Sequence, residues 1–463
     1  MLGLGEVDRR VVLLVVTLTS FLTPFASSSF NIALPSISRE FGLDAVTMSW
    51  ASLAYLLASA MFLVPFGRLA DIYGRRKVFL YGTIAFTLST ILLGIYPSAS
   101  TIIWLRALQG ISSAMIFGTG VAILVSVTPP REKGAILGVN AASVYIGLSV
   151  GPFLGGLITD TLGWRFILLV TAGIGAVAAL FMVWRLKGEW REAVGESFDL
   201  KGSLVYSLML LSLMYGFSLL PSTSSLIPIL IGLVAGSVFI WVEGRAEHPV
   251  LDINLFRSNR VFTFSNVAAL INFSATYAVT FLMSLYLQYI KGLSPEQAGL
   301  MLIASPIVQA VFSPIAGRLS DRMEPRKVAA IGMAVTMFGL VPFVFLNEET
   351  NVLLVVASLV VLGFGLSVFS SPNTNAIMSS VEKRLYGVAS STLGTMRLTG
   401  QMLSMGITLI IFAVFIGRVE IVPEVYPALT GSINIAFIIF SILCFVGVLA
   451  SLVNSRTSNP ATP

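Results

Sequence analysis

Long apolar runs separated by short polar connections make up almost all of this 463-residue chain. Each run is long enough to cross the hydrocarbon core of a bilayer, about 30 Å thick, as a helix. Helices are predicted because isolated strands cannot satisfy their backbone hydrogen bonds in lipid. The fourteen runs lie near residues 11–36, 47–67, 78–97, 101–128, 134–159, 165–184, 202–220, 225–242, 261–290, 297–317, 328–346, 350–378, 386–416 and 428–453. The pattern predicts an all-α polytopic membrane protein.

One polar cluster interrupts this pattern twice. The stretch at 67–78 reads GRLADIYGRRKV, and the stretch at 317–328 reads GRLSDRMEPRKV, so the two align without a gap at an offset of 250 residues. Two related halves of six spans explain the duplication, and parallel repeats of this kind are a transporter architecture. The expected parts are an N-terminal half at 1–190, two inserted spans with flanking loops at 191–254, and a C-terminal half with a short tail at 255–463.

Composition and charge exclude several classes of protein. Only 11% of the residues are charged, against about a quarter in soluble domains. The net charge of +6 does not indicate nucleic-acid binding, because the basic residues lie in short loops between apolar runs. Their distribution places both termini in the cytoplasm. We find no nucleotide loop, metal-ligand cluster or nucleophile motif, so neither an enzyme nor a cofactor is expected.

The repeated cluster is a candidate for conformational gating. Its first copy contains Gly67, Asp71, Gly74, Arg75 and Arg76, and its second contains Gly317, Asp321 and Arg326. A glycine lets helices approach closely, and an acidic side chain at a helix end beside basic ones can form a charge network that breaks during a rocking transition. Pro325 replaces the residue that matches Arg75. The second network is therefore expected to be weaker.

The fourth and fifth predicted spans carry two further motifs. WLRALQGISSAM includes Arg106, Gln109 and Gly110, and GLSVGPFLGGLI includes Gly151, Pro152, Gly155 and Gly156. A buried arginine in lipid is costly unless it faces a cavity or a partner, so Arg106 is a functional candidate. Its structural alternative is to bond backbone carbonyls of a neighbouring helix. The glycines predict a face for close helix packing, and Pro152 bends its helix.

These motifs resemble the signatures of the major facilitator superfamily and, within it, the fourteen-span drug:proton antiporters. Looser matches such as NIALPSI at 31–37 and DTLGWRF at 160–166 extend the resemblance over nearly the whole chain. It implies a major facilitator fold with two pseudo-symmetric six-helix halves plus two extra central helices. It also implies export of drug-like or amphipathic organic molecules by alternating access, in exchange for protons that move inward. The expected partners are a small-molecule substrate, protons and the bilayer, and we expect a monomer in the plasma membrane.

One departure from that family bears on the substrate. This branch commonly carries an Asp five residues before Asn31, where this chain has Ala26. No Asp or Glu falls inside a predicted span, so Arg106 and Arg397 are the intramembrane ionisable side chains. Two uncompensated cations favour an anionic or neutral polar substrate. The expected substrate or coupling residues are Asn31, Arg106, Gln109, Gly110, Tyr145, Gln288, Asn375 and Arg397.

Three functional hypotheses stay open on the sequence. The first is drug export by proton antiport. The second is an exporter or uniporter of organic anions recognised by Arg106 and Arg397. The third is a transport-inactive sensor on the same fold, although the glycine-rich gating motifs favour a protein that moves.

Overall fold

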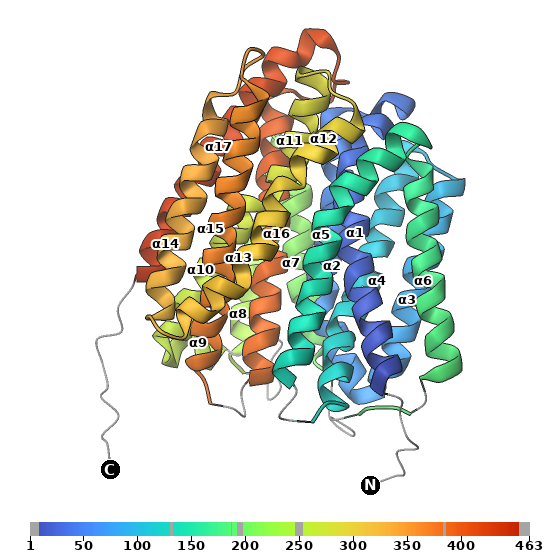
Figure 1. Ribbon diagram of the computed structural model, residues 1–463, viewed down its shortest axis with the longest axis vertical. Helices are drawn as coiled ribbons and strands as arrows, with labels where there is room; N and C mark the ends of the chain where they lie inside the picture. The colour runs from blue at the N-terminus through green and yellow to red at the C-terminus, as the bar shows by residue number, and fades with distance from the viewer. Residues whose placement is uncertain are drawn as a thin grey trace.

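The structure is a computed structural model that describes residues 9–129, 133–186, 188–191, 198–245, 253–382 and 386–452. Every regular element in these residues is helical, and the long helices stand side by side in one bundle (Figure 1). By length and composition, 14 of the helical segments can cross a membrane. The prediction of an all-α protein with fourteen spans is confirmed.

Six helices form the N-terminal half, and polar residues determine where several of them begin. They are α1 (Arg9–Phe41), α2 (Ala45–Tyr73), α3 (Arg75–Ile95), α4 (Ala99–Ser126), α5 (Lys133–Thr161) and α6 (Arg165–Arg185). Asp44 caps α2 by accepting a hydrogen bond from the Thr47 amide at 2.9 Å. Ser98 and Thr101 form a reciprocal capping box at the start of α4. These side chains satisfy amides that have no partner inside the helix.

The C-terminal half also has six spans, and several are interrupted by breaks in the helix. The short helix α9 (Ile253–Ser258) precedes them. The spans are built from α10 (Arg260–Thr276), α11 (Ala278–Leu285), the π-helical turn η2 (Tyr286–Ile290), α12 (Pro295–Leu302), α13 (Ala304–Ser320), α14 (Pro325–Leu340), the 3₁₀ turn η3 (Val341–Phe345), α15 (Val352–Ser379), α16 (Tyr386–Phe415), η5 (Pro423–Val425) and α17 (Tyr426–Leu452). One span, Arg260–Ile290, runs through α10, α11 and η2. π-Helical turns inside α-helices are frequent at functional sites.

The two inserted helices form a hairpin that lies against both halves. They are α7 (Leu200–Ser218) and α8 (Leu226–Glu243), joined through η1 (Thr223–Ser225). The Ser207 hydroxyl of α7 donates to the Met61 carbonyl of α2 at 3.5 Å. The Met214 side chain of α7 packs on Gly406 of α16. By contrast, α8 packs mainly on α7, and many of its apolar side chains are exposed, as expected for a surface that faces lipid.

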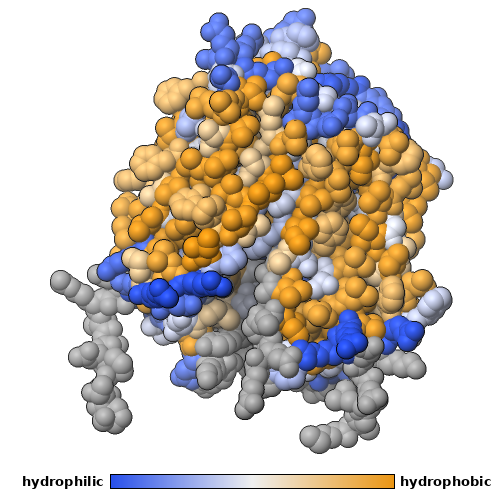
Figure 2. Space-filling model, viewed as in Figure 1, coloured by the Kyte–Doolittle hydropathy of each residue, from blue (hydrophilic) through white to orange (hydrophobic). Residues whose placement is uncertain are grey.

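The surface has an apolar band between two polar ends (Figure 2). An even number of spans places the start of α1 and the end of α17 on one side of the membrane, which we call the terminus end, opposite the far end. The halves meet where α1 contacts α11, α2 contacts α16 and α5 contacts α12. Between the halves, the surface is hollowed toward the terminus end (Figure 2).

Candidate functional site

Arg106 is the central feature of the interior. It lies on α4 and is only 1% exposed. Its Nε donates to the Ala51 carbonyl of α2 at 3.1 Å, and its Nη1 donates to Gln109 Oε1 at 2.9 Å. The guanidinium group lies 4.3 Å from the ring centroid of Phe30 and 4.5 Å from that of Tyr55. A desolvated cation over an aromatic ring gains about 2 kcal/mol, so these contacts offset part of the cost of burying the charge.

The other two residues of this motif support Arg106. Gln109 also donates to the Thr90 hydroxyl of α3 at 2.8 Å, so it links α3 to α4. A Cβ atom on Gly110 would lie 2.2 Å from the Tyr55 carbonyl oxygen. Gly110 therefore permits the close contact of α2 and α4 that holds Tyr55 beside the guanidinium. The backbone bond to Ala51 agrees with the structural role for Arg106, yet its buried Nη2 has no hydrogen-bond partner among the described residues.

A second polar group joins α1 to the C-terminal half at the same depth. The hydroxyl groups of Ser27 and Tyr277 are 2.9 Å apart. The Asn31 side chain accepts a hydrogen bond from Ser52 at 2.7 Å, and its backbone carbonyl accepts one from Ser284 at 3.2 Å. Phe273, whose ring centroid lies 5.4 Å from the Arg397 guanidinium group, precedes Tyr277 by four residues, about one helical turn. Arg106 thus contacts α1 through Phe30, Arg397 contacts α10 through Phe273, and the bond between Ser27 and Tyr277 joins these two parts of the chain.

Among the residues that the structure describes, no acidic side chain balances the two arginines. Arg397 on α16 is half-buried, and its guanidinium group lies 5.4 Å from the ring centroid of Phe273. Within the described residues, neither arginine forms an ion pair. Every Asp and Glu there lies in a connection or in the first or last turn of a helix. In the described part of the chain, Arg106 and Arg397 therefore carry positive charge inside the bundle without an acidic partner.

The two halves are hydrogen-bonded to each other at the far end. Gln288 in η2 donates to the Ile32 carbonyl at 2.9 Å, and the Tyr289 hydroxyl donates to the Pro35 carbonyl at 3.4 Å. The Ala45 amide donates to the Val419 carbonyl at 3.2 Å. Among the described residues, every hydrogen bond between the halves lies at the depth of Ser27 or farther toward this end. Gln288 thus lies in the far-end contact rather than beside Arg106.

The glycine-rich motif of α5 presents two faces for packing. A Cβ atom on Gly151 would lie 1.9 Å from the Ser28 hydroxyl of α1, and Gly147 and Gly155 also contact α1. A Cβ atom on Gly156 would instead lie 2.3 Å from the Pro295 carbonyl of α12. Likewise, a Cβ atom on Gly299 would lie 2.2 Å from the Pro152 carbonyl. The motif therefore packs against its own half on one face and against the other half on the second.

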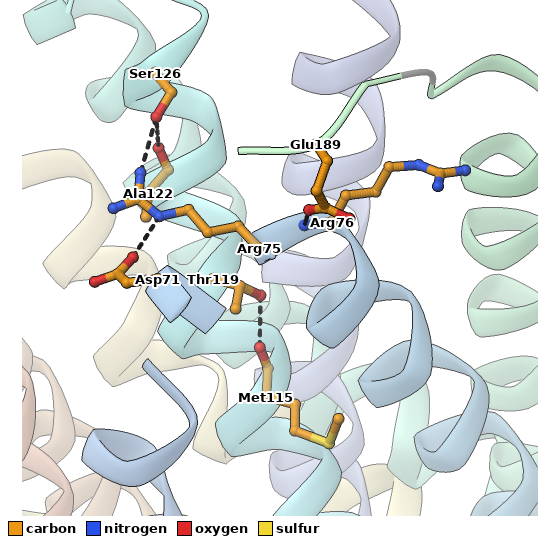
Figure 3. Close-up of polar contacts among 8 residues, drawn as sticks. All are labelled: Asp71, Arg75, Arg76, Met115, Thr119, Ala122, Ser126 and Glu189. Atoms are coloured by element: carbon orange, nitrogen blue, oxygen red, sulfur yellow. Dashed lines mark hydrogen bonds and ion pairs between the residues drawn. The ribbon is translucent and has the colours of Figure 1, made fainter. Parts of the chain in front are cut away.

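The first copy of the charged cluster forms a network at the terminus end (Figure 3). Arg75 pairs with Asp71 at 2.7 Å and donates to the Ser126 hydroxyl of α4 at 2.9 Å. The Arg76 amide donates to Glu189 in the connection after α6, at 2.8 Å. Gly74 has a φ of +125°, and a Cβ atom there would lie 2.4 Å from the Glu189 carboxyl carbon. These partners all belong to the N-terminal half.

Gly67 belongs to the same cluster and lies where α2 crosses α4. A Cβ atom on Gly118 of α4 would lie 3.3 Å from the Gly67 amide nitrogen. The two glycines therefore let the helix backbones approach closely, as small residues do at helix contacts in membranes.

The second copy of the cluster has different partners. Glu324 pairs with Arg326 at 2.5 Å and with Lys327 at 3.2 Å. The hydrogen bond from Lys327 and the charge of Arg326 lower the pKa of Glu324. Asp321 accepts a hydrogen bond from Asn375 at 3.4 Å, where Asp71 has an arginine. Asn375 therefore lies beside the second cluster, near Gly317 rather than near Arg106.

The structure gives the orientation of Tyr145 and reveals a contact of Glu189 that the sequence did not indicate. Tyr145 is half-buried on α5, and the helical spacing directs it away from the face on which Gly147 meets α1. Glu189 was not among the expected residues, although its carboxylate contacts the start of α3. Nothing in its sequence neighbourhood indicates this contact, because Glu189 is more than a hundred positions from Arg76.

Two consecutive matches to the family model described as Major Facilitator Superfamily cover residues 16–265 and 265–463. The chain belongs to the major facilitator superfamily. It is 27% identical to the riboflavin transporter RibZ of Clostridioides difficile (strain 630), over 98% of this chain and 99% of that protein. It is 30% identical to the multidrug resistance protein Stp of Mycobacterium tuberculosis (strain CDC 1551 / Oshkosh), over 80% of this chain and 70% of that protein.

Further comparisons agree with this assignment. The tetracenomycin C resistance and export protein of Streptomyces glaucescens is 26% identical, over 81% of this chain and 71% of that protein. Among solved structures, a bacterial homologue of the human lysosomal transporter Spinster, in an inward-facing and unoccupied conformation, matches with a TM-score of 0.72. That match has 15% identity and covers 97% of this chain and 98% of the other. The protein is therefore a multi-pass transporter of small molecules with the major facilitator fold, and not an enzyme.

Proposed function

We propose that this protein exports amphipathic organic molecules across the plasma membrane by alternating access between its two halves. The observation that carries the proposal is the uneven contact between the halves, which are hydrogen-bonded at the far end and hollowed between them toward the terminus end. A central site that is reached from one side at a time is the requirement for alternating access.

The direction of transport follows from the orientation of the bundle. The excess of basic residues in the connections at the terminus end favours a cytoplasmic location for that end. In this conformation the half-buried Arg397 would then be the first of the two arginines to receive cargo from the cytoplasm. An exporter needs such a loading state. The relatives, which include a multidrug resistance protein and a tetracenomycin C resistance and export protein, also support export of small organic cargo.

Proton antiport stays a prediction that rests on the resemblance. A proton antiporter needs a group in the path that holds either a proton or the cargo. In the described residues, every carboxylate lies in a connection or in the first or last turn of a helix, and Asp71 in the first charged cluster is paired with Arg75. The gating role of that cluster and of the α5 glycines is likewise part of the proposal.

Reconstituted transport tests this function. Purified protein in proteoliposomes is expected to move members of a panel of cationic, neutral and anionic amphipathic dyes, whereas protein-free liposomes are not. The same assay is repeated with an imposed pH gradient to test the coupling. If no dye of any charge moves, the export function is wrong and the sensor hypothesis gains support. If dyes move at a rate that the pH gradient does not change, proton antiport is wrong while export stands.

A further inference from the structure

We propose that the cargo is an organic anion whose charged group binds between Arg397 and the free Nη2 of Arg106, beside Tyr277. This inference rests on the proposed function and names its substrate class. The anionic group expected here is a carboxylate or a sulfonate, because both accept several hydrogen bonds from a guanidinium group. The attached ring system is expected to use the aromatic side chains around the site.

The hydrogen bonding of Arg106 is incomplete without a ligand. Its Nε and Nη1 are bonded to Ala51 and Gln109, whereas Nη2 is buried without a partner among the described residues. A buried donor of a charged group that lacks an acceptor costs more than the ~1–3 kcal/mol of a neutral one. Water or a cargo oxygen can satisfy it. A negatively charged oxygen does so most strongly, because hydrogen bonds between charged groups are roughly twice as strong as neutral ones.

The charge of the site favours the same ligand. Arg106 lies over Phe30 and Arg397 over Phe273, on the two segments that the Ser27–Tyr277 bond joins, and no Asp or Glu of the described residues lies at this depth. An anion lowers the electrostatic energy of two cations in a low-dielectric interior, and a cationic cargo raises it. The site therefore discriminates between cargo of opposite charge even where the ring systems are the same.

Ala26 occupies the position from which a carboxylate would change this preference. It is buried on α1 and lies four residues before Phe30, whose ring is against Arg106. Residues four apart share one face of a helix, so a longer side chain at position 26 would extend toward the same cluster. Its neighbour Ser27 is bonded to Tyr277. Because position 26 is alanine, α1 supplies no negative charge to Arg106 and Arg397 from this position.

An anionic cargo also explains export without a proton-binding carboxylate. Across a membrane that is negative inside, one negative charge gains about 2.3 kcal/mol per 100 mV on leaving the cell. The membrane potential alone therefore drives anion export. A cationic cargo would have to leave against the same potential and would need a coupled ion.

Matched dyes of opposite charge test the inference. Proteoliposomes with purified protein receive a potassium diffusion potential without a pH gradient, and 5-carboxyfluorescein and rhodamine 6G serve as anionic and cationic probes on one ring scaffold. We expect wild-type protein to move carboxyfluorescein faster than rhodamine 6G, in the direction set by the potential. Arg397→Ala is expected to lower the carboxyfluorescein rate by about tenfold or more, which corresponds to about 1.4 kcal/mol of lost binding. Arg418→Ala, at an exposed far-end arginine, is expected to leave it unchanged.

Two further variants separate recognition from folding. Arg397→Lys keeps the positive charge and is expected to retain most of the anion transport that Arg397→Ala loses. Ala26→Asp supplies the missing carboxylate and is expected to reverse the preference toward rhodamine 6G. A gain of cation transport cannot come from a misfolded protein, so this variant tests the inference even if Arg397→Ala is unstable.

The outcomes distinguish this inference from the export function itself. Transport of rhodamine 6G but not carboxyfluorescein by wild-type protein would overturn anion recognition and leave export intact. Anion transport that is equal in Arg397→Ala and wild-type protein would also overturn it. If neither these two dyes nor the wider panel moves, the export function fails.

Discussion

Several helix contacts in this protein exist only because a glycine lacks a Cβ atom. Gly110 lets α4 approach the Tyr55 carbonyl, and Gly74 leaves space for the Glu189 carboxylate. Gly74 differs from the helical glycines because its φ of +125° is also one that other residues rarely adopt. The contact of Glu189 with the Arg76 amide in the first charged cluster thus depends on a residue that carries no side chain.

Gly74→Ala is expected to destabilise the protein by about 1–3 kcal/mol, the usual cost of a strained backbone, and more if the Glu189 contact also breaks. The added Cβ atom would lie 2.4 Å from the Glu189 carboxyl carbon. Thermal unfolding of the purified protein in detergent measures the effect. Adding Glu189→Ala to Gly74→Ala is expected to restore the stability lost through the clash with Glu189, but not the stability lost through the strained backbone angle.

Gly173→Ala is the matched control for this substitution. Gly173 lies inside α6, with nothing within 4 Å of its added Cβ atom. Alanine in a helix interior is favoured over glycine by about 1 kcal/mol, so this variant is expected to unfold at the wild-type temperature or above it. Equal unfolding temperatures for Gly74→Ala and wild-type protein would show that the contact with Glu189 is not required.

At the scale of the helix, α5 packs against α1 of its own half on one face and against α12 of the other half on a second face. Its Gly151 face is fixed against α1, while Gly156 lies against Pro295 of α12. The second contact crosses between the halves and lies at the far end. It must separate whenever the far end opens. Because Gly156 has no side chain, α5 and α12 can pack closely there and can also separate without side chains that interdigitate.

Gly156→Ala is expected to shift the protein toward a state that is open at the far end. Its added Cβ atom would lie 2.3 Å from the Pro295 carbonyl, and such overpacking costs about 1–3 kcal/mol in the closed state only. The population of the open state should rise by about tenfold. Spin labels on Leu162 and Leu353, two exposed residues at the far ends of opposite halves, report the distance distribution.

Gly431→Ala provides the control for this experiment. It lies on α17 with nothing within 4 Å of the added Cβ atom, so the distance distribution is expected to match that of wild-type protein. A distribution for Gly156→Ala that is unchanged, in protein that is folded and labelled, would mean that this contact does not restrain the far end.

At the scale of the whole molecule, the two halves form a pair whose relative position determines access. The far end is closed by contacts from α1, α5 and the short antiparallel bridge between Asp44 and Glu420. The hairpin of α7 and α8 lies along another side, where α7 contacts both α2 and α16. Movement of the halves must therefore break the far-end bonds while α7 stays against both halves or slides between them.

A disulfide between positions 44 and 420 is expected to stop transport. The two residues face each other in an antiparallel bridge. Such pairs have Cα atoms about 4.5–5.5 Å apart, which is within the range of a disulfide. Asp44→Cys with Glu420→Cys, in a Cys444→Ser background, should transport at a rate near zero after oxidation and recover after reduction. Dye flux in proteoliposomes measures this.

The single variants Asp44→Cys and Glu420→Cys control for the lost side chains. Asp44 caps α2, so its loss alone is expected to cost about 1 kcal/mol of stability but to leave transport insensitive to oxidant. If mass spectrometry shows the cross-link and transport continues at the wild-type rate, the far end does not have to open during the cycle.

Much of this architecture could be predicted from local sequence. The spans, their even number and the duplicated cluster follow from the length of apolar runs and from the polar residues between them. The cost of exposing backbone groups to lipid leaves a helix as the solution for each run, whatever its neighbours. That no carboxylate of the described residues lies inside a span with Arg106 or Arg397 was also predictable, because it requires only that the spans be placed correctly.

The partners of the candidate residues were decided by the tertiary structure. Gln288 lies in the far-end contact, Asn375 lies beside the second charged cluster, and Glu189 lies against Gly74. These contacts depend on how each helix is rotated and tilted and on which end of the bundle is closed. Apolar runs in a membrane carry little of that information, since lipid and protein interiors are similarly apolar and do not mark which face turns inward. The sequence thus determined the number and nature of the helices, and their packing determined which polar side chains meet.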